Sequence, residues 1–69
     1  MAEHVYKSIE ITGSSSKTVE DAINGAIAKA GKTLHNLRWF QVSEVRGAIE
    51  ANKVAHWQVT MKLGFTLDE

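Results

Sequence analysis

Apolar and polar residues alternate along the last third of the chain. The apolar positions run from Ala55 to Leu67, and the intervening positions, from His56 to Thr66, are mostly polar. This period of two predicts a β-strand over 54–67 with one face in a core. The amide of Gln58 lies on the opposite, polar face of that strand.

Two further segments also read as strands. Residues 5–12 place Val5, Ile9 and Ile11 at one parity, and β-branched residues dominate that inward set. Residues 38–50 form a longer strand whose apolar positions change parity. One extra residue reverses the facing of a strand, so we expect a β-bulge near Ser43 and Glu44. Residues 51–53 then form a short turn.

An apolar stripe between the first two strands predicts one helix. Its members repeat at helical spacing: Val19, Ala22, Ile23, Ala26, Ile27 and Ala30. The serines after Gly13 suit a helix start, and we assign Ser15 as the N-cap. The helix ends between Gly31 and Asn36. The order is therefore β-α-β-β, an α+β fold whose last two strands form an antiparallel hairpin.

One helix covers only one face of a sheet. The other face carries Gln58, Thr60 and Lys62, which is too mixed in character for a simple solvent face. We therefore expect this second face to be where subunits meet and where a ligand binds.

Composition narrows the function classes. The 69 residues make one small domain, 1–69, whose own hydrophobic core is marginal. The chain has no cysteine, so neither disulfides nor thiolate metal sites stabilise it. We therefore expect a homo-oligomer, in which contacts between copies supply the missing stability. Eight basic residues balance eight acidic ones, which argues against a nucleic-acid partner. We see no apolar run long enough to span a membrane and no secretion signal, and we expect a cytoplasmic protein.

Three side chains are candidates for ligand binding. Trp39 either stacks on a flat ligand ring or is a core aromatic; since Phe40 follows it, both cannot face the same core. Gln58 either forms directed hydrogen bonds to such a ring or faces solvent. Arg46 either clamps a phosphate or forms a salt bridge with Glu44 or Glu50.

Catalytic and metal chemistry lack a motif in this sequence. His4, His35 and His56 fall in different predicted elements without metal-ligand spacing, so we expect no metal site. No nucleophile-and-base arrangement is visible, and we read the serines after Gly13 as capping residues. The sequence therefore offers no recognisable catalytic motif.

The chain resembles the dodecins, small bacterial and archaeal flavin-binding proteins. The resemblance runs along nearly the whole chain, through these segments: Val5-Tyr6-Lys7, Thr12-Gly13-Ser14-Ser15, Lys32-Thr33-Leu34, Leu37-x-Trp39-Phe40-x-Val42, Val45-Arg46-Gly47, His56-Trp57-Gln58-Val59 and Lys62-Leu63-Gly64-Phe65-x-Leu67.

The resemblance implies a hollow homododecamer whose three-stranded antiparallel sheets partly enclose the helices. It implies that paired flavins stack between symmetry-related copies of Trp39, that Gln58 hydrogen-bonds the flavin ring, and that Arg46 lies near the phosphate of FMN. The resemblance also implies that the protein stores, buffers or sequesters flavin and is not an enzyme. The alternatives are a structural cage with a vestigial or different ligand site, and a flavin-dependent oxidoreductase.

Three positions depart from the pattern of the family. Arg38 and Gln41 stand where acidic residues are common, and Thr66 stands where many bacterial members carry arginine. These departures bear on which flavin is preferred. FMN is the leading expectation, with riboflavin, FAD and lumichrome as alternatives, and coenzyme A is a further candidate ligand.

Overall fold

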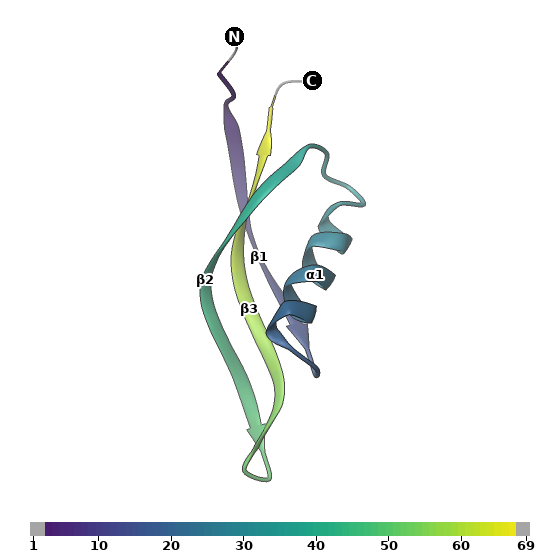
Figure 1. Ribbon diagram of the computed structural model, residues 1–69, viewed down its shortest axis with the longest axis vertical. Helices are drawn as coiled ribbons and strands as arrows, with labels where there is room; N and C mark the ends of the chain where they lie inside the picture. Colours follow the sequence, from purple (N-terminus) through teal and green to yellow (C-terminus); the bar gives the residue numbers. More distant parts are fainter. Residues whose placement is uncertain (1–2, 68–69) are drawn as a thin grey trace.

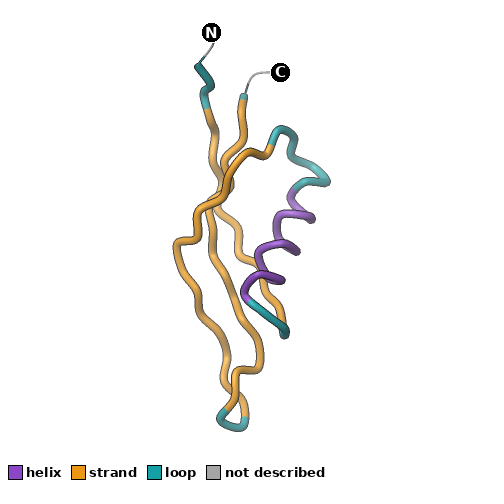
Figure 2. Tube along the Cα trace, in the orientation of Figure 1, coloured by secondary structure: helices purple, strands orange, loops and turns teal. Residues whose placement is uncertain are grey.

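The computed structural model describes residues 3–67 and contains three strands and one helix. Their order is β1 (Tyr6–Ser15), α1 (Val19–Ala30), β2 (Leu37–Glu50) and β3 (Lys53–Thr66), which confirms the predicted β-α-β-β order. The strands form one antiparallel sheet in the order β1-β3-β2, with the predicted hairpin between β2 and β3. Figure 1 shows α1 lying along one face of this sheet, and Figure 2 shows the elements along the chain trace.

Strand β1 is longer than predicted, and the helix begins later. Pairing with β3 continues past Thr12 through Ser15, which lies opposite Trp57. The N-cap is therefore Thr18 and not Ser15; its hydroxyl accepts a hydrogen bond from the Asp21 backbone N–H at 2.9 Å. Ser15 supports the connection, since its hydroxyl accepts from the Lys17 N–H at 2.9 Å and donates to the Asp21 carboxylate at 2.7 Å.

The core is a thin layer between α1 and the middle of the sheet. Its fully buried side chains are Ala22 from the helix and Val59, Met61 and Leu63 from β3. Gly13 permits this closeness, because a Cβ there would overlap the Ala22 carbonyl oxygen and lie 2.8 Å from Ala26 Cβ. The predicted apolar row of β3 is thus confirmed as the inner row, facing the helix.

Strand β2 contains three irregularities in its pairing with β3. One lies between Val42 and Glu44, where the change of parity predicted it, and one between Ala48 and Ile49. The third, between Leu37 and Trp39, was not predicted. Arg38 and Ser43 are extra residues of β2, and each reverses the facing of the β2 side chains beyond it, which decides which of them face away from the helix. At the shift between Ala48 and Ile49 the extra residue, Ala55, belongs to β3.

The helix leaves much of the sheet uncovered. It packs on β1 and β3, whereas β2 runs along the far side of the sheet (Figure 1). The inward-facing β2 side chains Phe40, Val42 and Val45 consequently remain 48%, 37% and 48% exposed. The molecule is elongated, with a radius of gyration of 14.3 Å where a compact chain of this length would have about 11 Å.

Two glycine-to-alanine substitutions should have opposite effects on stability. Gly25→Ala should stabilise the protein by up to about 1 kcal/mol, because a Cβ at this helical position meets nothing within 4 Å and alanine favours helix. Gly13→Ala should destabilise it, because the new methyl group would push α1 away from β1. Chemical denaturation of the two variants checks this; equal shifts of the midpoint in one direction would contradict the close packing at Gly13.

Candidate functional site: a composite ligand face

The side of the sheet opposite α1 carries all three candidate binding residues. We call this side the outer face; the register of the strands places five rows of side chains on it. These rows are Tyr6 and Thr66; Ser8, Gly64 and Trp39; Glu10, Lys62 and Gln41; Thr12, Thr60 and Glu44; and Ser14, Gln58 and Arg46. The face is mixed in character, as expected from the sequence.

Trp39 reaches the outer face because of the bulge at Arg38. Leu37 pairs with Phe65 and packs toward the core, and in a regular strand Trp39 would point the same way. The extra residue turns Trp39 to the outer face, where its indole covers Gly64 and stays 38% exposed. Phe40, the next residue, pairs with Leu63 and faces inward, so Trp39 and Phe40 lie on opposite faces as expected.

Gln58 and Arg46 are direct neighbours on the outer face. They are opposed residues of β3 and β2, and Ser14 of β1 lies on the other side of Gln58. Gln58 is half-buried and Arg46 is exposed. The bulge after Val42 is responsible for this pairing, since without it Arg46 would face the helix. An amide and a guanidinium side by side can bind the polar parts of an anionic ligand.

Trp39 and Gln58 share a face but lie far apart within one chain. Trp39 opposes Gly64, which is six residues along β3 from Gln58. At about 3.3 Å per residue the two lie roughly 20 Å apart. A planar ligand of three fused rings cannot touch both residues of one chain.

Tyr6 and Gly64 were missed as site residues by sequence reasoning. The Tyr6 ring meets the indole of Trp39 edge-on, with centroids 6.2 Å apart and planes at 65°. Tyr6 shares a parity with the polar residues of β1, which was the only signal of its outer facing. Nothing in the sequence reveals that Gly64 lies under an aromatic ring.

The three positions that depart from the family pattern occupy different environments. Thr66 is buried on the outer face opposite Tyr6, and its N–H donates to the Asn36 carbonyl at 3.2 Å. Gln41 is exposed on the outer face, next to Lys62. Arg38 is the bulge residue, and its guanidinium donates to its own neighbour's carbonyl, that of Leu37, at 3.4 Å.

The fold is that of a small β-α-β-β protein, and its outer face carries an exposed aromatic side chain, Trp39. The chain belongs to the dodecin family, whose model matches residues 5–68. A dodecin from Thermus thermophilus is 46% identical over 65 residues, 94% of each chain. The structure of dodecin from Streptomyces davaonensis is 51% identical, has a TM-score of 0.90, and is matched over 99% of this chain and 100% of its own.

A more distant relative is described as a calcium-chelating dodecin. It comes from Mycobacterium tuberculosis, is 25% identical with a TM-score of 0.79, and is matched over 93% of this chain and 91% of its own. Within residues 3–67 of the present chain, no group of three or more histidine, aspartate or glutamate side chains is placed to hold a metal ion. In the same part of the chain, no helix has the length and apolarity needed to cross a membrane.

Proposed function

We propose that this protein is a non-enzymatic flavin-binding protein that stores or sequesters FMN in a homododecameric shell. The observation that carries the proposal is the placement of Trp39, Gln58 and Arg46 on one sheet face, with the indole half-exposed and backed by the main chain. Membership in a family known for flavin binding supports it. Riboflavin, FAD and lumichrome use the same ring system and are the alternative flavins.

The separation of Trp39 from Gln58 supports a site shared between copies. A contact with two-fold symmetry sets residue i of one copy against residue j of the other, and the reverse. Two outer faces that meet in opposite directions therefore bring Trp39 of one copy toward Gln58 and Arg46 of the next. Each ligand then stacks on one copy and receives its polar contacts from the other.

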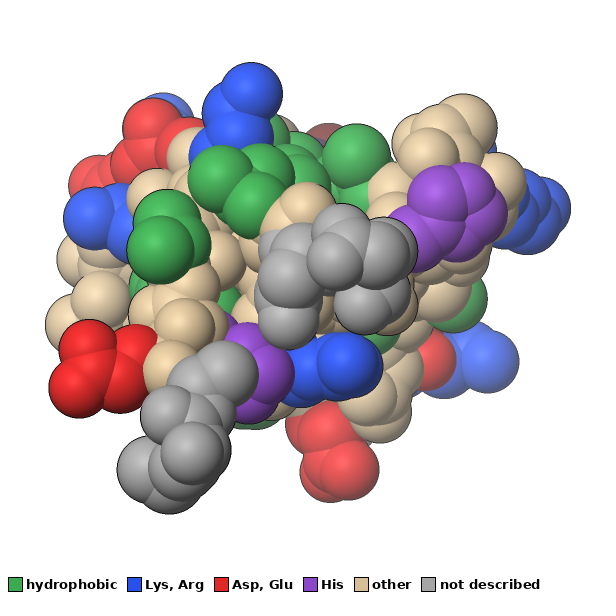
Figure 3. Space-filling view, turned by 90° about the horizontal axis from the view of Figure 1, so that it is seen from above, with side chains coloured by type: hydrophobic (Ala, Val, Ile, Leu, Met, Phe, Trp, Pro, Cys, Tyr) green, Lys and Arg blue, Asp and Glu red, His purple; other side chains and the backbone are tan. Residues whose placement is uncertain are grey.

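The surface that one chain leaves open supports an oligomer. The accessible surface is 5211 Å², whereas a compact chain of 7.6 kDa exposes about 4300 Å². The excess is close to the ~800 Å² that one partner buries in a standard interface. Figure 3 shows apolar side chains open at the end of the molecule where the two termini lie.

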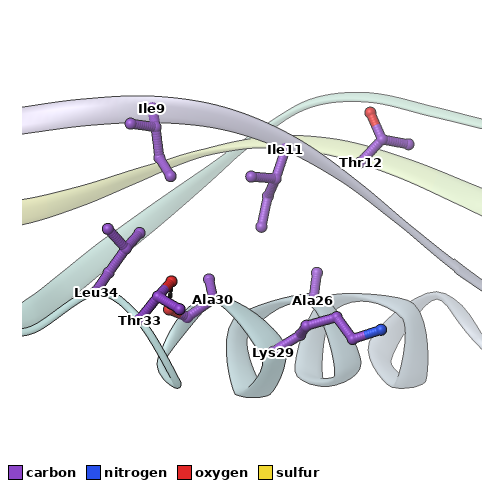
Figure 4. A pocket seen from close by; sticks show the side chains of 8 residues that line it. All are labelled: Ile9, Ile11, Thr12, Ala26, Lys29, Ala30, Thr33 and Leu34. Carbon is purple, nitrogen blue, oxygen red and sulfur yellow. Dashed lines mark hydrogen bonds between the residues drawn. The ribbon is translucent and has the colours of Figure 1, made fainter.

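Two apolar features on the inner side of the sheet are complementary in character. A groove of about 440 Å³ lies between α1 and β1, with Ile9 and Ile11 on the strand side and Ala26, Ala30 and Leu34 on the helix side (Figure 4). The exposed row of Phe40, Val42 and Val45 lies at the opposite edge of the sheet. Such a pair suits a head-to-tail contact between identical chains, which closes into rings.

A storage role agrees with the chemistry of the outer face. Two isoalloxazine rings stacked on each other between two indoles, as the resemblance implies, have no open face for hydride transfer to a substrate, and electron transfer from tryptophan quenches their excited state. The Ser15 hydroxyl donates to the Asp21 carboxylate, but both groups belong to the helix start, where Ser15 also accepts from the Lys17 N–H. Steady oxidation of NAD(P)H by the purified protein would support the oxidoreductase alternative.

Arg46 is the residue proposed to hold the phosphate of FMN. It opposes Gln58 across the strand pair and is exposed, so its guanidinium is available for a bidentate contact. Thr66 offers no charge at the position where many bacterial family members carry arginine. The phosphate therefore depends on fewer cations here, and the same exposed cation is open to the phosphates of coenzyme A.

Trp39→Ala should abolish quenching of FMN fluorescence and weaken binding by about five- to a hundredfold, because a base–aromatic stacking contact is worth roughly 1–3 kcal/mol. Titration of the protein with FMN measures this, and light scattering reports the size of the oligomer. Trp57→Phe is the matched control, since Trp57 faces the helix side and should leave binding unchanged. An intact oligomer that binds FMN equally well with and without Trp39 would instead favour the structural cage.

Arg46→Ala should weaken binding of FMN by about tenfold and leave riboflavin nearly unaffected, since only FMN presents a phosphate. The estimate is at the low end for a charge-assisted hydrogen bond because Arg46 is exposed. Calorimetric titration with both flavins measures the difference, and Arg38→Ala serves as the control cation. Equal losses for FMN and riboflavin would show that Arg46 does not contact the phosphate.

Mixed oligomers test whether the site is shared between copies. Trp39→Ala chains and Gln58→Ala chains should each bind FMN weakly, and refolding them together should restore about a quarter of the sites, those with an intact residue from each copy. FMN quenching at equal total protein measures the recovery. Absence of any recovery in mixed oligomers of normal size would contradict a site shared between copies.

A further inference from the structure

The indole of Trp39 rests on bare main chain. Gly64 is buried on the central strand, and a Cβ built on it would overlap Cε2 and Cζ2 of Trp39 and lie 2.6 Å from Cδ2. Real Cβ atoms essentially never come so close to another heavy atom. The position of the indole therefore requires that residue 64 have no side chain.

A second side chain limits the indole from the side. The Tyr6 ring meets it edge-on at 6.2 Å, the arrangement that aromatic pairs prefer. Tyr6 is in turn contacted by the ring of His4, at 6.2 Å between centroids. Gly64 lies beneath the indole and Tyr6 at its edge, so the ring plane is held from two directions.

We infer that Gly64 and Tyr6 are positioning residues that hold the indole of Trp39 in a fixed orientation before a ligand binds; we call the indole held in this way the stacking plate. The inference rests on the proposed function, because it concerns the same ligand. One face of the indole lies on the sheet and the other is open, so each Trp39 stacks on a single ring. A plate already held in place loses little conformational freedom on binding, which strengthens binding without adding a contact.

The effect of a side chain at residue 64 depends on which of the two groups is able to move. Gly64 lies on β3, which pairs with a strand on both sides, so its backbone is held by two ladders. The indole belongs to an edge strand and is 38% exposed. The ring, and not the main chain, must therefore give way, and the fold should survive the loss of the plate.

The test compares Gly64→Ala with Gly25→Ala, both in a Trp57→Phe parent in which Trp39 is the only tryptophan. Gly25→Ala is the same chemical change at a helical position where the added methyl group has open space around it. Three quantities are measured for each: the near-UV circular dichroism of Trp39, the Kd for FMN and the size of the oligomer. Gly64→Ala should lose the dichroism and bind FMN about five- to a hundredfold more weakly, the worth of a stacking contact.

Tyr6 is tested by a graded pair in the same parent. Tyr6→Phe keeps the ring edge against the indole and should behave as the parent. Tyr6→Ala removes it and should reduce both the Trp39 dichroism and the affinity for FMN, by less than Gly64→Ala does. Equal behaviour of the Phe and Ala variants in both measurements would remove Tyr6 from the inference.

The outcomes separate the inference from the proposed function. A parent that binds no FMN overturns the proposed function and, with it, the role of Gly64 in binding. A parent that binds FMN together with a Gly64→Ala variant of equal affinity overturns the inference alone. Dichroism retained while affinity falls also overturns it, because the loss would then not come from a displaced indole. Loss of both signals in an oligomer of normal size supports it.

Discussion

The composition of the outer face depends on which β2 side chains point away from the helix. That in turn depends on the alternation of side chains along β2 and on how β2 pairs with β3. A strand places successive residues on opposite faces, and each bulge reverses that assignment for the residues beyond it. The bulge at Arg38 lets Leu37 pack inward while Trp39 faces outward. The bulge after Val42 keeps Val45 inward and places Arg46 beside Gln58. Two extra residues thus reconcile an apolar inner row with a polar and aromatic outer face on one strand.

Sequence patterns predicted the elements and their faces well, because these depend on local periodicity. The bulge near Ser43 was predictable because apolar residues on both sides of it reveal the change of parity. The bulge at Arg38 was not, because the predicted strand begins at Arg38 and leaves out Leu37, the residue whose inward facing reveals the bulge. The N-cap was assigned to Ser15 since serine suits a cap, but pairing between Ser15 and Trp57 extends β1 to that residue and delays the helix to Thr18.

The residues of the candidate site could be predicted from their types in the sequence, but the distances between them could not. Trp39, Gln58 and Arg46 carry chemistry that reads directly from the sequence, and their shared face depends on strand parity and on the two bulges of β2, at Arg38 and after Val42. The separation of Trp39 from Gln58 depends on the pairing register, which no local pattern specifies. The contact between Trp39 and Gly64 depends on a rotamer and a cross-strand neighbour, so a glycine that looks like an ordinary strand residue proves to lie under the ring.

The thin core and the divided site have the same physical origin. One short helix covers only part of a three-stranded sheet, so the chain buries just Ala22, Val59, Met61 and Leu63 as its central cluster. Under the proposed function, other copies complete both the apolar surface on the inner side and the candidate binding residues on the outer side. A ligand held between copies binds the assembled state in preference to separated chains, and it therefore stabilises that assembly by mass action. Under the proposed function, loading with flavin therefore prolongs the lifetime of the assembled shell.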